Sequence, residues 1–94
     1  MGIEVADNAE AQRYEIRVDG RLAGFAAYRE RPGRLEFTHT EIDDEYEGQG
    51  LGSKLVAQTL DDVRSRELEV TPICPFVKSY IERHPEYQDL VHQS

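Results

Sequence analysis

The sequence has a single cysteine and no long apolar run. With Cys74 alone, no internal disulfide can form, which is typical of proteins in a reducing compartment. No stretch approaches the ~20 apolar residues that a helix needs to cross a bilayer. The first eight residues have neither the basic charge nor the apolar run of a secretion signal. We therefore expect a cytoplasmic protein that has no membrane partner.

Basic residues are also scarce, with 11 lysines and arginines against 19 aspartates and glutamates and a net charge of −8. A nucleic-acid binder needs a basic stripe to displace counterions, and none is visible. Nucleic acid is therefore not an expected partner. The acidic balance favours cationic partners such as amines, although a solvated exterior explains it equally well.

The chain contains no internal repeat, no low-complexity tract and no linker rich in glycine, serine or proline. We therefore expect one domain over residues 1–94, as a monomer or weak dimer. A domain of this size buries only roughly 60–65% of its unfolded surface, which leaves room for one sheet and two helices.

Hydrophobic periodicity predicts an α+β (α/β) fold. Alternation of polar and apolar residues indicates strands, turns follow at Asp19-Gly20 and at Pro32-Gly33, and helical spacing begins at Leu51. The expected order is an antiparallel meander, a β-α-β unit with parallel strands, and a C-terminal helix. The expected strands are 3–5, 13–18, 22–28, 34–42 and 68–73, with helices over 51–63 and from 75 to before Pro85.

The connection between the fourth strand and the first helix contains Gly48, Gly50 and Gly52. Glycine lets the backbone take left-handed angles and approach a ligand closely. The first amides of a helix have no intrahelical acceptor and carry partial positive charge, so the stretch predicts a phosphate site. A Walker loop and a dinucleotide fingerprint both require other spacings. The alternative interpretation is a tight connection that binds no ligand.

Two further residues are candidates for chemistry. Strict alternation puts His39 on one face with Leu35 and Phe37, as either a core histidine or a general base beside the glycine loop. Cys74 ends a strand just before a helix, as either a small buried residue or a reactive thiol. If the two strands are neighbours, Cys74 and His39 can form a thiol–imidazole pair.

These motifs resemble the GNAT superfamily of acyl-CoA N-acyltransferases, whose pyrophosphate loop reads Gln/Arg-x-x-Gly-x-Gly/Ala. Gly50 and Gly52 match that loop, while Glu47 stands in the Gln/Arg place. Over roughly residues 35–91 the chain is similar to the very small single-domain members, the YjdJ-like subgroup. The matching segments are His39-Thr40-Glu41, Gly48 to Gly52, the run from Pro72 to Phe76, Tyr80-Ile81, and the run from His84 to Leu90.

The resemblance implies acetyl-CoA as donor, an amine acceptor (a small molecule or a protein lysine or N-terminus), and no metal. It also implies a splayed parallel strand pair that receives the pantetheine arm. Most members have a tyrosine one position after Tyr80 that protonates the leaving thiolate, and Ile81 stands there in this chain. The implied cofactor-binding residues are Thr40, Glu41, Ile42, Gly48, Gln49, Gly50, Leu51, Gly52, Ser53 and Tyr80, with His39 and Cys74 as catalytic candidates.

Two other functions remain open from the sequence. One is a module that binds CoA or acyl-CoA without turnover, which Glu47 and Ile81 favour. The other is a small interaction protein in which the glycine loop is purely structural.

Overall fold

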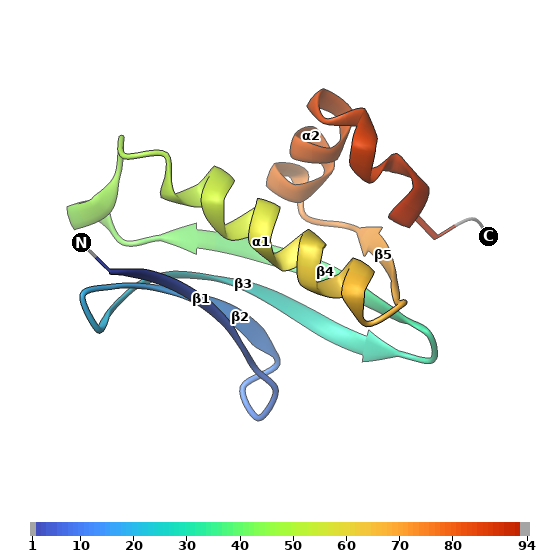
Figure 1. Ribbon diagram of the computed structural model, residues 1–94, viewed down its shortest axis with the longest axis horizontal. Helices are drawn as coiled ribbons and strands as arrows, with labels where there is room; N and C mark the ends of the chain where they lie inside the picture. The colour runs from blue at the N-terminus through green and yellow to red at the C-terminus, as the bar shows by residue number, and fades with distance from the viewer. Residues whose placement is uncertain (1, 93–94) are drawn as a thin grey trace.

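A computed structural model describes residues 2–92 as two layers, a five-stranded sheet with both α-helices packed on one of its faces (Figure 1). In Figure 1, α1 crosses in front of the sheet and α2 lies above it. The elements are β1 (Ile3–Asn8), β2 (Arg13–Val18), β3 (Arg21–Arg31), β4 (Arg34–Ile42), the 3₁₀ turn η1 (Asp44–Tyr46), α1 (Leu51–Ser65), β5 (Glu69–Pro72), α2 (Pro75–Arg83) and the 3₁₀ segment η2 (Pro85–Leu90).

The strands lie side by side in chain order, β1-β2-β3-β4-β5. The first four pair antiparallel, and β5 pairs parallel to β4 after the α1 crossover. This arrangement confirms the predicted fold class. β1 is longer than the predicted 3–5, because Asp7 and Asn8 pair with Tyr14 and Arg13 although their type is disfavoured in strands.

The core lies between the inner face of the sheet and the two helices. From α1, buried residues recur at helical spacing, and Val77 of α2 joins Val56 and Leu60 over Ala26 and Phe37 of the sheet. Burial of this apolar stripe, rather than helix propensity, provides most of the stability of such a helix. The largest fully buried side chains are Tyr14, Phe37, Ile16, Leu35, Leu55, Leu60, Val56, Val63, Val70, Val77 and Thr59.

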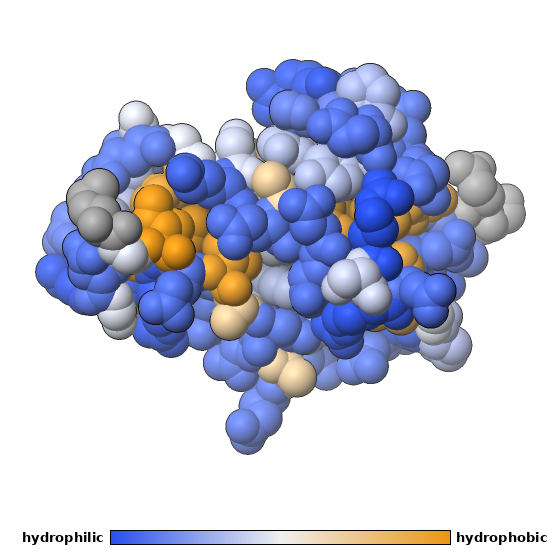
Figure 2. Space-filling model, in the orientation of Figure 1, coloured by the Kyte–Doolittle hydropathy of each residue, from blue (hydrophilic) through white to orange (hydrophobic). Residues whose placement is uncertain are grey.

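The outer face of the sheet carries charged side chains in place of helices. On β2, Glu15 lies between Arg13 and Arg17, whose side chains contact its carboxylate at 2.7 and 3.0 Å. Although burial opposes it, these hydrogen bonds, with one from Asn8, lower the pKa of Glu15. The surface in view is mostly polar, with apolar atoms in small areas (Figure 2). Within residues 2–92, no helix is both long and apolar enough to cross a membrane.

A β-bulge at Thr38 changes the face on which the end of β4 lies. Tyr28 pairs with Phe37, but its neighbour Ala27 pairs with His39, so Thr38 has no partner on β3. Adjacent residues of β3 point to opposite faces, and therefore Phe37 and His39 do too. The prediction that His39 shares a face with Leu35 and Phe37 is wrong, because the extra residue reverses the alternation.

β4 and β5 part after Phe37. Their parallel pairing runs from Arg34 with Glu69 to Phe37 with Pro72. The amide of Cys74 then donates to the carbonyl of Phe37 at 2.7 Å, and the chain turns into α2. Residues 38–42 of β4 consequently have no strand on that side in the described part of the chain, which confirms the predicted splay.

Gly24 allows β3 and β4 to approach each other where β4 ends. A Cβ at this position would lie 2.4 Å from the carbonyl oxygen of Glu41. Because backbone cannot move aside cheaply, we expect Gly24→Ala to lower the free energy of unfolding by about 1–3 kcal/mol, the usual cost of overpacking. Urea denaturation measures the change. Gly2→Ala is the matched control, since its Cβ would meet only Asp19 Oδ1 at 3.9 Å; equal effects of the two changes would contradict this account.

Candidate functional site

The glycine loop leads directly into the N-terminus of α1. Gly48 and Gly50 have φ angles of 81° and 73°, which side-chain-bearing residues rarely adopt, and Gly50 is the N-cap of α1. The 15-residue helix begins at Leu51, and its first turn contains no acidic residue. Its N-terminal amides and dipole are therefore available to an anion.

A cavity of about 250 Å³ lies against this loop. Ile42, Tyr46 and Phe76 contribute apolar walls, and Glu47 brings a carboxylate to the place where the family pattern has Gln or Arg. Among the predicted cofactor residues, Gln49 is exposed and does not line the cavity. The residues that line the cavity are Ile42, Tyr46, Glu47, Gly48, Gly50, Leu51, Gly52, Ser53 and Phe76.

Cys74 lies at the point where β4 and β5 part. Its side chain is 4% exposed, and its Sγ is 3.4 Å from the hydroxyl of Thr40 on the free edge of β4. Cys74 is also the N-cap of α2, with extended backbone angles and Pro75 as the first helical residue. The thiol thus lies at the inner end of the open edge that leads toward the glycine loop.

Beyond the bulge, a second group of side chains occupies the outer face. Phe25 pairs with Glu41, the ring centroids of Phe25 and His39 are 6.0 Å apart, and His39 Nε2 is 3.9 Å from Glu41 Oε1. The guanidinium of Arg13 also lies over the ring of Phe25, 4.6 Å from its centroid. The His39 and Glu41 side chains are 61% and 62% exposed, so both are accessible to a solute.

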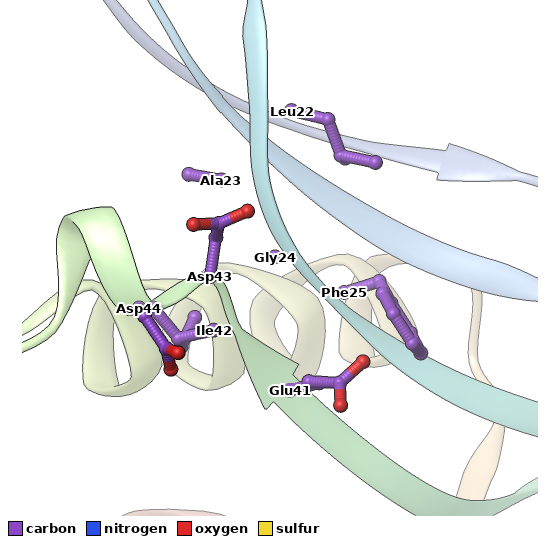
Figure 3. Close-up of a pocket in the computed structure, with 8 residues that line it drawn as sticks. All are labelled: Leu22, Ala23, Gly24, Phe25, Glu41, Ile42, Asp43 and Asp44. Carbon is purple, nitrogen blue, oxygen red and sulfur yellow. The ribbon is translucent and has the colours of Figure 1, made fainter.

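A cavity of about 320 Å³ adjoins this group at the start of β3 and the end of β4. Figure 3 shows Phe25 and Glu41 side by side, with Leu22 on β3 and Asp43 and Asp44 after β4. Asp43 is partly used within the fold, because its carboxylate accepts from the amide of Glu45 and caps η1. Although acidic groups gather here, residues 2–92 contain no cluster of three His, Cys, Asp or Glu side chains that could hold a metal ion.

The predicted pair of His39 and Cys74 is not formed. Cys74 contacts Thr40, whereas the neighbouring His39 points to the opposite face of β4 toward Phe25. The physical reason is again the bulge, which turns His39 to the outer face. The two catalytic candidates therefore lie on opposite sides of the open edge.

Tyr80 is also placed away from the loop. Its ring stacks on His84 at 4.0 Å and packs against Tyr87 at 6.0 Å between centroids. Burial raises the pKa of Tyr80, and the carboxylates of Glu86 and Asp61 raise it further. This side chain joins α2 to η2, and the cofactor role predicted for it has no support in its surroundings.

Two site residues escaped the sequence reasoning, Phe25 and Phe76. Alternation predicts Phe25 only as one member of a strand, and helical spacing predicts Phe76 on the apolar face of α2. Phe76 is in fact 40% exposed and lines the loop cavity. Helical spacing could not reveal this exposure, because Phe76 lies four residues before Tyr80 and so falls on the same helix face as the buried Val77, Tyr80 and Ile81.

Comparison with known proteins gives consistent results. The family model described as GCN5-related N-acetyl-transferase matches residues 13–90. Protein NATD1 of Gallus gallus is 26% identical over 92 residues, covering 96% of this chain and 84% of the relative. Protein NATD1 of Mus musculus is 25% identical over 85 residues, covering 88% of this chain and 77% of the relative.

Solved structures show the same fold. A GCN5-like protein from Staphylococcus aureus, solved by NMR, has a TM-score of 0.71 and 25% identity and covers 97% of this chain and 89% of its own. The Escherichia coli ribosomal-protein-S18-alanine N-acetyltransferase has a TM-score of 0.62 and 17% identity, over 88% of this chain and 53% of its own. N-acetylglutamate synthase of Neisseria gonorrhoeae, complexed with coenzyme A and N-acetyl-glutamate, has a TM-score of 0.56 and 17% identity. The match covers 83% of this chain and 22% of the synthase chain.

The position of Cys74 predicts a thiol that is shielded and independent of His39. Because its side chain is buried, we expect slow reaction with an aromatic disulfide reagent in the folded protein and fast reaction in urea. His39→Ala should leave the slow rate unchanged, whereas Thr40→Ala, which removes the contacting hydroxyl, should raise it. Thiol titration followed by absorbance measures all three rates; a rate that falls on His39→Ala would restore the pairing.

Proposed function

Since the chain belongs to the GCN5-related N-acetyltransferase family, we propose that it binds acetyl-CoA and transfers the acetyl group to an amine. One observation carries the proposal: the glycine loop and the unpaired edge of β4 meet at the same end of the strand. The loop cavity is lined by Ile42 of that edge as well as by Gly50 and Gly52. An extended ligand with an anionic middle and a linear arm fits this combination.

On the donor side, the loop amides would hold the pyrophosphate. Gly48 and Gly50 leave no Cβ between backbone and ligand, with no atom within 4 Å of the place a Cβ would take. The remaining contributors from the sequence prediction are Gln49, Leu51, Gly52 and Ser53. The pantetheine arm would lie along residues 40–42, where the backbone groups of β4 have no strand partner on that side.

At the acyl end, Thr40 and Cys74 would contact the thioester. Their mutual contact at 3.4 Å is at the inner end of the open edge, beside the helix N-terminus of α2. The thiol of Cys74 would line the acyl pocket. Mass spectrometry of the Cys74 peptide after incubation with acetyl-CoA distinguishes a thiol that only contacts the acyl group from one that carries a covalent acetyl group.

On the acceptor side, the amine would approach from the helix-free face. Because β4 has no neighbour beyond Phe37, a ligand along its edge is accessible from both faces of the sheet. His39 would accept a proton from the acceptor ammonium, directly or through water, and Glu41 would stabilise the imidazolium that forms. The amine nitrogen then bonds to the carbonyl carbon and the carbon–sulfur bond breaks. The proton that the nitrogen loses as the amide forms passes through water to the departing thiolate, and His39 returns its own proton to solvent.

A domain of this size does not enclose its acceptor in a groove, so the acceptor would bind at an open surface. We assign the chain to the very small members of the family, in which no helices enclose an acceptor groove. The cavity beside Phe25 and Glu41 is open and acidic, which favours a cationic amine, whether a metabolite or a protein lysine or N-terminus.

The alternative function is CoA binding without turnover. Ile81 favours it, because it stands where most members have the tyrosine that protonates the leaving thiolate. The two functions differ in one measurement. Release of free CoA from acetyl-CoA in the presence of a panel of primary amines supports transfer, and saturable binding without release supports the module.

Titration with CoA in a calorimeter tests the donor site, and Gly50→Asp is the variant that probes it. A side chain and a negative charge at the N-cap of α1 should abolish binding. Gly33→Asp is the matched control, because Gly33 has a similar φ of 76° and equally open surroundings in a distant turn. Both variants should fold with the same loss of stability; CoA affinity that is equal in the two would exclude the loop.

Glu47 gives a test of opposite sign. If its carboxylate faces bound pyrophosphate, Glu47→Arg should tighten CoA binding, since repulsion becomes attraction. The gain should shrink as salt rises from 0.01 to 0.15 M, because the Debye length falls from about 30 to about 8 Å. Glu45→Arg, in η1 just before the cavity, is the control for general surface charge. Equal gains in both variants would mean that Glu47 has no specific position at the phosphate.

A further inference from the structure

We infer that Phe76 is a binding residue for the pantetheine arm of CoA, and that position 52 is glycine in order to seat Phe76. The inference rests on the proposed function and adds to it a residue to which the sequence motifs assign no role. It starts from a difference among the three loop glycines.

Gly48 and Gly50 are needed for their backbone angles, since both have a positive φ and there is open space where a Cβ would be. Gly52 lies within α1 without a positive φ, so its conformation is open to any residue. A Cβ on Gly52 would instead lie 2.8 Å from Cζ of Phe76 and 3.4 and 3.5 Å from the two Cε atoms. The absent side chain makes room for the ring.

Phe76 has one covered side and one open side. It is the second residue of α2 and remains 40% exposed, in a molecule with few exposed large apolar side chains. Contact with Gly52 fixes the ring against the first turn of α1, while the rest of the ring lines the loop cavity. An aromatic surface held in place at a cavity wall is suited to an apolar part of a ligand.

The position of Phe76 identifies that part. The ring lines the cavity at the loop, where the pyrophosphate would bind, and it belongs to the residue two positions after Cys74, where the thioester would lie. The segment of CoA between its pyrophosphate and its thiol is pantetheine, which begins with a dimethyl-substituted carbon. Apolar groups of this kind gain from burial against an aromatic ring, whereas the nucleotide lies on the other side of the pyrophosphate.

The test compares two ligands on two variants. Calorimetry with CoA should show affinity reduced about tenfold in Phe76→Ala, the effect of losing roughly 50 Å² of apolar contact, and less in Phe76→Leu. Binding of 3′,5′-ADP, which lacks pantetheine, should be the same in wild type and both variants. Unchanged or tighter CoA binding by Phe76→Ala would overturn the inference, since a ring that merely plugs the cavity opposes the ligand.

The role of Gly52 is tested by a double-mutant cycle. Gly52→Ala favours the helix by propensity but displaces the ring, so CoA affinity should fall by about the same factor as in Phe76→Ala. In the Phe76→Ala background, Gly52→Ala should have no further effect on CoA binding. An equal loss in both backgrounds would show that the Cβ meets the ligand itself. A wild-type protein that binds no CoA overturns the proposed function, whereas the inference alone fails if wild type binds and the Phe76 variants match it.

Discussion

The parting of β4 from β5 is the constraint on which the rest of the molecule depends. Parallel pairing stops where the Cys74 amide donates a hydrogen bond to the carbonyl of Phe37 and the chain turns into α2. Backbone amides and carbonyls must find partners, so the bare edge at 38–42 is satisfied by water or by a ligand. The same turn places the N-terminus of α2 beside that edge. One structural event thus creates both the open row of polar groups and the thiol at its inner end.

The bulge at Thr38 gives this edge two chemically different sides. Towards the helices lie Thr40 and the buried thiol of Cys74, in apolar surroundings. Towards the bare face lie His39 and Glu41, exposed and titratable. Without the extra residue, His39 would point into the core below the helices, where an imidazole needs a buried partner. A ligand on the edge would therefore contact an apolar side and a solvated side.

Much of the fold could be predicted from sequence, because alternation, helical spacing and turn residues act locally. The meander, both helices and the parallel pairing of β4 with β5 are confirmed. The bulge could not be found in this way, since no glycine or proline marks it and strict alternation continues through Thr38 in the sequence. Tyr80 was misplaced for a related reason. Its contacts with His84 and Tyr87 depend on how η2 folds back, which helical spacing does not specify.

The three glycines of the loop are required for different physical reasons, although they look alike in the sequence. Gly48 and Gly50 satisfy backbone angles, which act within the loop. Gly52 satisfies a contact with Phe76, which connects the loop to α2 across the molecule. Because the atoms nearest to a Cβ at position 52 are at the far end of the Phe76 side chain, such a Cβ would displace the ring and not the backbone of α2. Gly52 therefore determines where an aromatic wall of the loop cavity lies, whereas Gly48 and Gly50 determine the path of the backbone.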